Sequence, residues 1–290
     1  MGPQKAGKRR GGGAGTNPGS DRRRLMIFFS VVVLVYAIGL SLIGYIGFLP
    51  AVLIIMYAPA LGALAARVAG PGVIWWGRPS WWIFAGLLPT VVVLGALWVA
   101  AQLGWVQFSS LALRDALIAV PLPILINLFA VFGEELGWRG FLWPLLRGRF
   151  PFLIATAILT PIWLVYHVPL ILAGVYGSLD GMPAFATALL GWTLFIGVVT
   201  DRSRSVWPAV LCHAAWNTYV EKSFTGVVDG VATPAFIGGG LVGEFGWVPA
   251  IATLALGTGF AWWHVKSGRG GRLAEPLPRT NGIAPVVPGT

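Results

Sequence analysis

Long apolar stretches without charged side chains dominate this sequence and restrict the folds available to it. Leu25–Leu49 contains no Asp, Glu, Lys or Arg. A helix that crosses the hydrocarbon core of a bilayer needs about 20 mostly apolar residues. Leu25–Leu49 is too long for the core of a signal peptide and shows no small-residue cleavage site, so it predicts a retained first membrane span.

Seven further segments have the length and composition of membrane spans. Together with the first, the predicted spans are 25–49, 51–69, 81–102, 116–138, 152–173, 183–200, 206–220 and 247–265. Only 10% of the residues are charged, against about 25% in soluble proteins, which excludes a soluble enzyme. No segment alternates polar and apolar residues with the period of a barrel strand. We therefore predict an all-α, polytopic membrane protein of about eight transmembrane helices.

The chain divides into one membrane domain and two tails. Residues 1–24 are rich in Gly, Lys and Arg, which predicts a disordered basic tail. The transmembrane domain covers 25–265, with 104–115 at the membrane interface and 221–246 as a loop that includes at most a short helix. Residues 266–290 form a second cytoplasmic tail.

The distribution of basic residues predicts the orientation. With a cytoplasmic N-terminus and eight alternating spans, 18 of the 20 Lys and Arg residues fall in cytoplasmic segments, against only Arg114 and Lys222 outside. By the positive-inside rule, both termini are cytoplasmic in a multi-pass protein of the cell membrane. The net charge of +10 comes from short clusters between apolar runs, which indicates contact with the lipid bilayer and no nucleic-acid partner.

Few ionisable side chains fall inside the predicted spans. Because charge is costly in the hydrocarbon region, each is a functional candidate. The candidates are Glu134, Glu135, Arg139, His167 and His213, with Asn127 and Asn217 as buried amides. The remaining polar groups are interpreted as non-catalytic: His264 as an interfacial residue beside Trp262 and Trp263, and Asp115, Asp180 and Asp201 as residues outside the spans.

Helical spacing brings these candidates together in pairs. Glu135 and Arg139 are four residues apart, share a helix face and are expected to form an ion pair. Glu134 is turned by about 100° from Glu135, which leaves it without a partner on its own helix. The same interval of four recurs in the pairs Trp163–His167 and His213–Asn217. Three helices with polar faces predict a shared polar cavity within the membrane.

These residues resemble three motifs of a known family. Residues 134–139 read EExxxR, 163–167 read FxxxH with Trp in place of Phe, and 213–217 read HxxxN. In this order they resemble the CPBP family, the CAAX proteases and bacteriocin-processing enzymes, also called type II CAAX prenyl endopeptidases. The resemblance covers about residues 116–220. Trp163 is a mild departure, because an aromatic packing role survives the substitution.

The resemblance implies an intramembrane endopeptidase whose site opens toward the cytoplasm and whose substrates are membrane-associated proteins or peptides, prenylated ones among them. Glu134 would be the general base that activates water, and His167 would help to hold and deprotonate that water. His213 and Asn217 would donate hydrogen bonds to the oxyanion, while Glu135 and Arg139 would form a supporting pair. These are the groups that peptide hydrolysis needs.

Three alternatives remain open. Glu134, His167 and His213 are a plausible first shell for zinc, although the HExxH pattern is absent and Asn217 suits an oxyanion site better, so we expect no metal cofactor. A proton-coupled transporter could use the same ionisable groups, but the sequence lacks the repeated halves typical of transporters. A non-catalytic membrane scaffold could bind partners through the same cavity.

Overall fold

The computed structural model describes residues 18–67, 78–119, 121–223 and 234–273. In these ranges almost everything is helical, and the strands described there are two residues each. The α-helices are α1 (Pro18–Ile46), α2 (Phe48–Arg67), α3 (Ser80–Gln102), α4 (Ser110–Ala119), α5 (Pro121–Gly137), α6 (Trp143–Arg149), α7 (Phe152–Leu172), α8 (Met182–Ser203), α9 (Trp207–Trp216) and α10 (Trp247–His264). The predicted all-α class is confirmed.

Short irregular segments continue or connect these helices. Three are π-helical, η1 (Trp138–Leu142), η2 (Asn217–Ser223) and η4 (Val265–Arg269), and one is a 3₁₀ turn, η3 (Gly239–Leu241). The strands β1 (Gln107–Phe108) and β2 (Phe236–Ile237) pair antiparallel and join two connections at one end of the bundle.

Six helices of the described residues are long and apolar enough to cross a membrane: α1, α2, α3, α7, α8 and α10. A seventh span results if α4 is counted with the continuous helix from α5 to α6, from which it is bent by 67°. The chain is therefore an integral, polytopic membrane protein. Eight spans were predicted, and the one that is not among these seven is 206–220. There α9 has only 10 residues before it changes into the π-helical η2.

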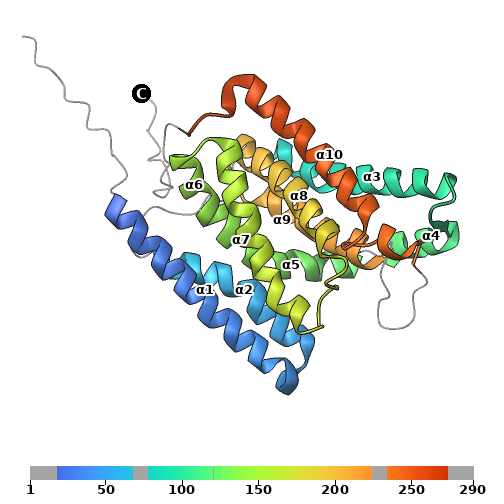
Figure 1. Ribbon diagram of the computed structural model, residues 1–290, viewed down its shortest axis with the longest axis horizontal. Helices are drawn as coiled ribbons and strands as arrows, with labels where there is room; N and C mark the ends of the chain where they lie inside the picture. The colour runs from blue at the N-terminus through green and yellow to red at the C-terminus, as the bar shows by residue number, and fades with distance from the viewer. Residues whose placement is uncertain (1–17, 68–77, 120, 224–233, 274–290) are drawn as a thin grey trace, which may run out of the picture.

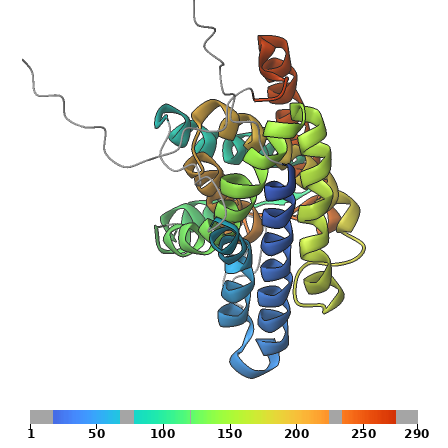
Figure 2. The ribbon, with the colours of Figure 1, turned by 90° about the vertical axis from the view of Figure 1, so that its left-hand side faces the viewer.

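The helices form a bundle around α8, the most buried of the candidate spans. Figures 1 and 2 show α1 and α2 as an antiparallel pair at one edge. Next to this pair, α5 packs between α2 and α9, whereas α10 packs against α8 and α3. The motif residues Glu134, Glu135, Arg139, Trp163 and His213, carried by α5, η1, α7 and α9, are buried in this bundle.

Glycines permit the closest of these contacts. A Cβ atom added at Gly137 would lie 2.2 Å from the Pro59 Cβ atom, and one at Gly133 would lie 2.6 Å from the Met56 carbonyl oxygen. These two glycines, four residues apart, form the small-xxx-small pattern that lets membrane helices approach. Because their face packs on α2, the residues between them, Glu134 and Glu135, are turned away from α2 and into the bundle.

The inner ends of both predicted tails are part of the described structure, and the disorder predicted for residues 18–24 needs correction. Residues 18–24, predicted as disordered, begin α1, and the Asp21 carboxylate there is buried between Arg24 (3.5 Å) and Arg149 (2.9 Å). Residues 265–273 pack on the bundle: the Phe152 amide donates to the Gly270 carbonyl over 2.8 Å. The rest of each predicted tail, 1–17 and 274–290, lies outside the described residues, as does 224–233 in the predicted loop over 221–246.

Candidate active site

The Glu135 carboxylate is the fixed point of the polar cluster. It is completely buried, and its Oε1 atom accepts hydrogen bonds from Arg139 Nη1 (3.1 Å) and His213 Nδ1 (2.8 Å). The predicted ion pair between Glu135 and Arg139 is therefore present, and it extends to a histidine on a distant helix. Arg139 lies in η1, and π-helical insertions of this kind are frequent at functional sites.

Trp163 joins Glu134 to the rest of the cluster. Its indole Nε1 donates to Glu134 Oε2 over 3.2 Å, and the Arg139 guanidinium carbon lies 3.9 Å from the centroid of its ring. The His213 ring meets the same indole edge-on, with 5.6 Å between centroids. Trp163 thus contacts Glu134 and Arg139 of α5–η1 as well as His213 of α9. A phenylalanine at this position could pack against these residues but could not donate the hydrogen bond.

The partners of His167 and His213 indicate which ring nitrogen carries the proton. The Trp163 carbonyl lies 2.8 Å from His167 Nδ1, and because a carbonyl oxygen only accepts, Nδ1 must donate. A neutral His167 ring then presents a bare Nε2. His213 Nδ1 likewise donates to the Glu135 carboxylate, so its Nε2 donates a hydrogen bond only when the ring is an imidazolium.

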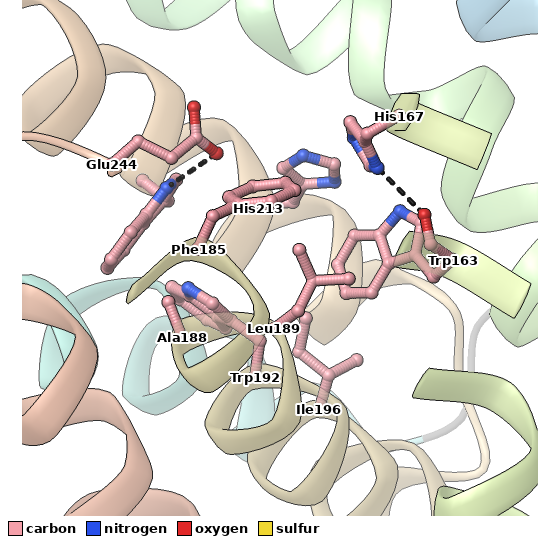
Figure 3. A pocket seen from close by; sticks show the side chains of 10 residues that line it. Trp163, His167, Phe185, Ala188, Leu189, Trp192, Ile196, His213 and Glu244 are labelled. Atoms are coloured by element: carbon pink, nitrogen blue, oxygen red, sulfur yellow. Dashed lines mark hydrogen bonds between the residues drawn. The ribbon is translucent and has the colours of Figure 1, made fainter. Parts of the chain in front are cut away.

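Both histidines face a small cavity inside the bundle (Figure 3). About 20 Å³ of it is open to the centre of a water molecule, which is room for about one water. Its walls are mostly aromatic and aliphatic side chains of α7, α8 and α9, including Trp163, Phe185 and Trp192. The predicted polar cavity is therefore mainly apolar, with a few polar groups at its wall.

Comparison with protein families gives one match for this part of the chain. Residues 116–219 match the family described as type II CAAX prenyl endopeptidase Rce1-like. This segment is similar to the Rce1-like family. The match runs from α4 to η2, so it contains the whole cluster around Glu135 and confirms the resemblance seen in the three motifs. A comparison with curated proteins found no match.

The family description of the Rce1-like segment names an endopeptidase, so a peptidase that acts on membrane-associated proteins is the general function it implies. Of the four residues predicted as catalytic, the structure joins three through shared contacts: Glu134, His167 and His213 all meet Trp163. Glu134 does not border the cavity. Trp163 does, and its indole N–H donates a hydrogen bond to Glu134.

Asn217 is placed differently from the other three. It is half-buried where α9 changes into η2, one turn after His213, and it is not part of the cavity wall. Its neighbour Thr218 instead ties η2 to α5, because the Asn127 amide donates to the Thr218 hydroxyl over 2.9 Å. Of the two amides predicted to be buried, Asn127 is buried in this structural hydrogen bond, whereas Asn217 is only half-buried beside the cluster.

The residues proposed as zinc ligands do not fit a metal site as they are arranged. Within the described ranges, no three His, Cys, Asp or Glu side chains lie close enough together to hold a metal ion. In addition, the Nδ1 atoms of His167 and His213 are already engaged by Trp163 and Glu135.

Glu244 is a cavity residue that sequence reasoning missed. It precedes α10, is half-buried, and accepts hydrogen bonds from the Tyr176 hydroxyl and from Trp216 Nε1 (3.2 Å). One signal for it exists in the sequence: Glu244 is the only Asp, Glu, Lys or Arg between Asp229 and Lys266. Because residues 221–246 were predicted to be a loop, the sequence did not indicate that Glu244 lines the same cavity as the two histidines.

The cavity lies toward the end of the bundle where α7 ends and α10 begins. His167 is five residues before the last residue of α7, Phe185 is in the first turn of α8, and Glu244 is three residues before the first residue of α10. In the orientation expected from the basic residues, this end would face the non-cytoplasmic side. A site that opens toward the cytoplasm, as the resemblance implies, therefore does not fit the predicted orientation.

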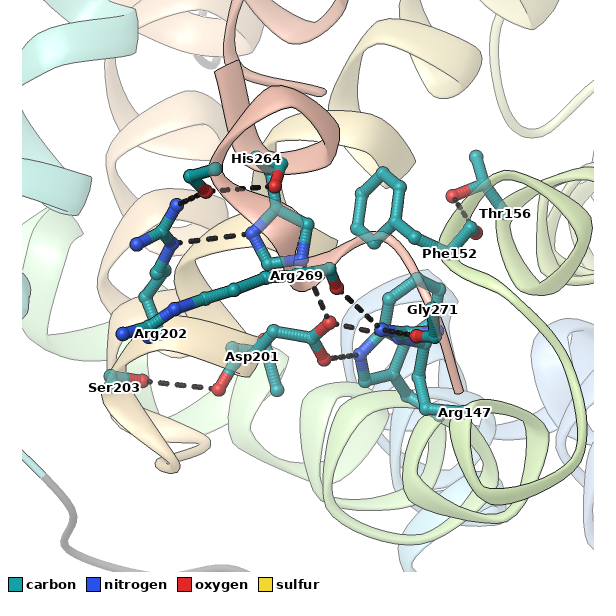
Figure 4. A network of polar contacts seen from close by, with 12 residues as sticks. Arg147, Phe152, Thr156, Asp201, Arg202, Ser203, His264, Arg269 and Gly271 are labelled. Atoms are coloured by element: carbon teal, nitrogen blue, oxygen red, sulfur yellow. Dashed lines mark hydrogen bonds and ion pairs between the residues drawn. The ribbon is translucent and has the colours of Figure 1, made fainter. Parts of the chain in front are cut away.

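A second polar network lies at the opposite end of the bundle (Figure 4). Asp201, predicted to lie outside the spans, is buried in α8 and accepts from Trp143 Nε1 (2.9 Å) and Arg147 Nε (2.8 Å). His264, predicted as interfacial, is also buried, with its Nε2 3.3 Å from Asp201 Oδ2. Sequence reasoning did not predict this network, because its partners come from helices far apart in the sequence.

Proposed function

We propose that this protein is an intramembrane endopeptidase that hydrolyses peptide bonds of membrane-associated proteins with a glutamate-activated water. The single observation that carries the proposal is the convergence of Glu134, His167 and His213 on Trp163, beside a cavity that accommodates one water molecule. The Rce1-like match over 116–219 supports the same reaction class. It also makes a prenylated CAAX peptide the first substrate to test.

The proposed attack uses His167 and Glu134 together. A water in the cavity donates one hydrogen bond to the bare Nε2 of His167, and its other proton passes to the Glu134 carboxylate as the water oxygen bonds to the carbonyl carbon. When the C–N bond breaks, protonated Glu134 returns this proton to the leaving amine. The charge of Glu134 is restored after each cycle, so no co-reactant other than water is consumed.

Trp163 controls whether Glu134 can take this role. The indole borders the cavity whereas Glu134 accepts the indole N–H from behind it. A change of the Trp163 rotamer on substrate binding would open Glu134 to the water. Catalytic contacts in free enzymes are often incomplete and tighten only in the substrate complex.

The oxyanion is stabilised by His213 in this proposal. Its Nδ1–H is held by Glu135, so a second proton on Nε2 makes an imidazolium that donates to the developing negative charge. Asn217, one helical turn away, is the second donor. The cluster then contains two carboxylates and two cations, Glu134 and Glu135 against Arg139 and His213, which keeps its net charge near zero inside the membrane.

The main test is the variant Glu134→Gln, assayed on a prenylated CAAX peptide and on a membrane-anchored reporter protein. Loss of a general base lowers rates by about 10²–10⁴-fold, so we expect a loss in that range with the folded protein retained in detergent. Asp180→Asn, which changes an exposed carboxylate in the α7–α8 loop, is the matched control and should keep the wild-type rate. A wild-type rate for Glu134→Gln refutes the proposal.

We also propose that the reaction needs no metal, because the donor groups do not gather into a metal site. A chelator-treated sample, shown by elemental analysis to contain no zinc, should cleave the peptide at the untreated rate. Loss of activity that is restored by added Zn²⁺ would contradict this proposal and favour a zinc-dependent peptidase.

We further propose a location and an orientation for the protein. The distribution of basic residues supports a multi-pass protein of the cell membrane with both termini cytoplasmic. In that orientation the cavity is nearer to the non-cytoplasmic side of the membrane.

A further inference from the structure

Five arginines surround a hollow at the end of the bundle opposite the cavity. The hollow has a volume of about 390 Å³, and we call it the arginine basin; its basic walls are Arg78, Arg202, Arg204, Arg269 and Arg272. Asp201 is the one carboxylate among its described walls. The basin lies where α8 and α10 end, at the level expected for lipid headgroups if α8 and α10 span the membrane.

The charge of this basin is not balanced by the described residues. Both oxygens of Asp201 already accept hydrogen bonds, from Trp143 and from Arg147. Arg78, Arg204, Arg269 and Arg272 have no carboxylate within ion-pair distance in the described part of the chain, whereas other cations there do. Guanidinium groups held together repel each other, so an anion bound between them stabilises the arrangement.

An apolar groove runs between α3 and α10 beside the basin. Its volume is about 510 Å³, and we call it the α3–α10 groove; its walls include Trp81, Phe84, Leu256, Gly259, Phe260 and Trp263. Gly259 leaves open space in it, because a Cβ atom added there would meet no atom within 4 Å. A groove of aromatic and aliphatic side chains on two candidate spans is suited to a hydrocarbon chain.

Arg202 and Trp263 connect the two hollows. Arg202 forms part of the basin wall, and its guanidinium carbon lies 3.9 Å from the centroid of the Trp263 ring, which is part of the groove wall. Arg202 is also held in place by a hydrogen bond from its Nε to His264 Nδ1 over 3.2 Å. A basic hollow and an apolar groove therefore adjoin across one stacked pair of side chains.

We propose that this composite surface binds one anionic phospholipid, with its phosphate in the arginine basin and an acyl chain in the α3–α10 groove. The combination matches an amphiphile and not a small ion, since an inorganic anion would use only the basin. Basic pockets between transmembrane helices are typical sites for acidic headgroups. The site is independent of the proposed peptidase reaction and is tested without an activity assay.

The basin is tested by lipid binding to the full chain in detergent, measured by native mass spectrometry with dioleoylphosphatidylglycerol and dioleoylphosphatidylcholine. We expect wild type to bind the anionic lipid at least about tenfold more tightly, since several basic side chains would contact the acidic headgroup. The triple variant R204Q/R269Q/R272Q should lose this preference. The control R23Q/R67Q/K266Q removes the same charge from exposed residues outside the basin and should retain it.

The groove is tested by Gly259→Leu, which fills it without a clash at the Cβ atom, against Gly44→Leu in α1, where space is equally open. We expect several-fold weaker lipid binding for Gly259→Leu alone. The proposal is overturned if the basin variant keeps the preference, if its control loses it equally, or if Gly259→Leu binds like wild type. It is also overturned if inorganic phosphate displaces the lipid at equal concentration, because the basin would then be a site for free phosphate.

Discussion

Trp163 shows how a single ring can alter the meaning of a motif. Its position corresponds to a phenylalanine in the family pattern, and packing alone suggested a mild change. In the structure its N–H is a donor to Glu134 and its carbonyl is an acceptor for His167. The substitution therefore adds a hydrogen bond to a buried carboxylate, and the sequence pattern could not show that bond.

Trp163→Phe separates packing from hydrogen bonding. Phenylalanine keeps an aromatic ring beside Arg139 but leaves Glu134 Oε2 without the indole donor, and loss of a hydrogen bond to a charged group costs about 1.5–3 kcal/mol. We expect a decrease of about that size in the free energy of unfolding, measured in detergent, with peptidase activity kept within about tenfold. Trp98→Phe, at a Trp that is 52% exposed on α3, is the control. Equal stability of the two variants would show that the indole bond contributes nothing.

Glu135 has a different position in the same cluster. It is the shared acceptor of Arg139 and His213, so one buried carboxylate orients a guanidinium from η1 and an imidazole from α9. Helical spacing predicted the first contact, because both residues lie on one helix. The second contact joins residues 78 positions apart and depends on how α5 packs against α9.

At the level of elements, the helix that carries Glu134 and Glu135 is positioned by the glycines on either side of them. The Gly137 backbone approaches α2 so closely that a methyl group there would lie 2.2 Å from Pro59 Cβ and 2.5 Å from the Pro59 carbonyl carbon. Backbone atoms cannot yield as a flexible side chain can. The position of the two carboxylates thus depends on the α2–α5 contact.

Gly137→Ala is expected to push α5 away from α2. Overpacking of this kind typically costs about 1–3 kcal/mol, and we expect a loss of stability in that range together with a reduced cleavage rate, because Glu134 moves with α5. Gly148→Ala is the matched control: its Cβ meets no atom within 4 Å, and alanine favours a helix over glycine. Thermal unfolding of both variants in one detergent gives the comparison. Equal unfolding temperatures would contradict the steric argument.

Features that depend on local sequence were predicted accurately, whereas features that depend on tertiary contacts were not. The span over 81–102 agrees with α3, and that over 152–173 agrees with α7, because length and hydropathy are local properties. The change of α9 into η2 was not predicted, since neighbouring helices determine where a helix widens. Glu244 and Asp201 were missed for the same reason: each acts through partners that only the tertiary structure brings near.

For the whole molecule, polar groups gather at two depths. The cluster around Glu135 lies in the interior, near the cavity, and the Asp201 network with the arginine basin lies at the end where α8 and α10 finish. Arg147 ties this end together, because it bonds Asp201, the Phe150 carbonyl and the Gly271 carbonyl. One end of the bundle is thus held together by a polar network beside the arginine basin, and the cavity lies toward the other end.

Which membrane side each end faces decides from where a substrate reaches the cavity. Cys212 is the only cysteine and is buried, so single cysteines introduced at exposed positions give clean labelling. Ser178→Cys lies in the loop between α7 and α8, near the cavity end, and Lys266→Cys lies after α10, near the basin. With intact cells and a membrane-impermeant maleimide, the positive-inside rule predicts labelling of Ser178→Cys from outside and of Lys266→Cys only after permeabilisation. The reverse pattern would overturn the predicted orientation and place the cavity end on the cytoplasmic side, where the family resemblance expects substrates to enter.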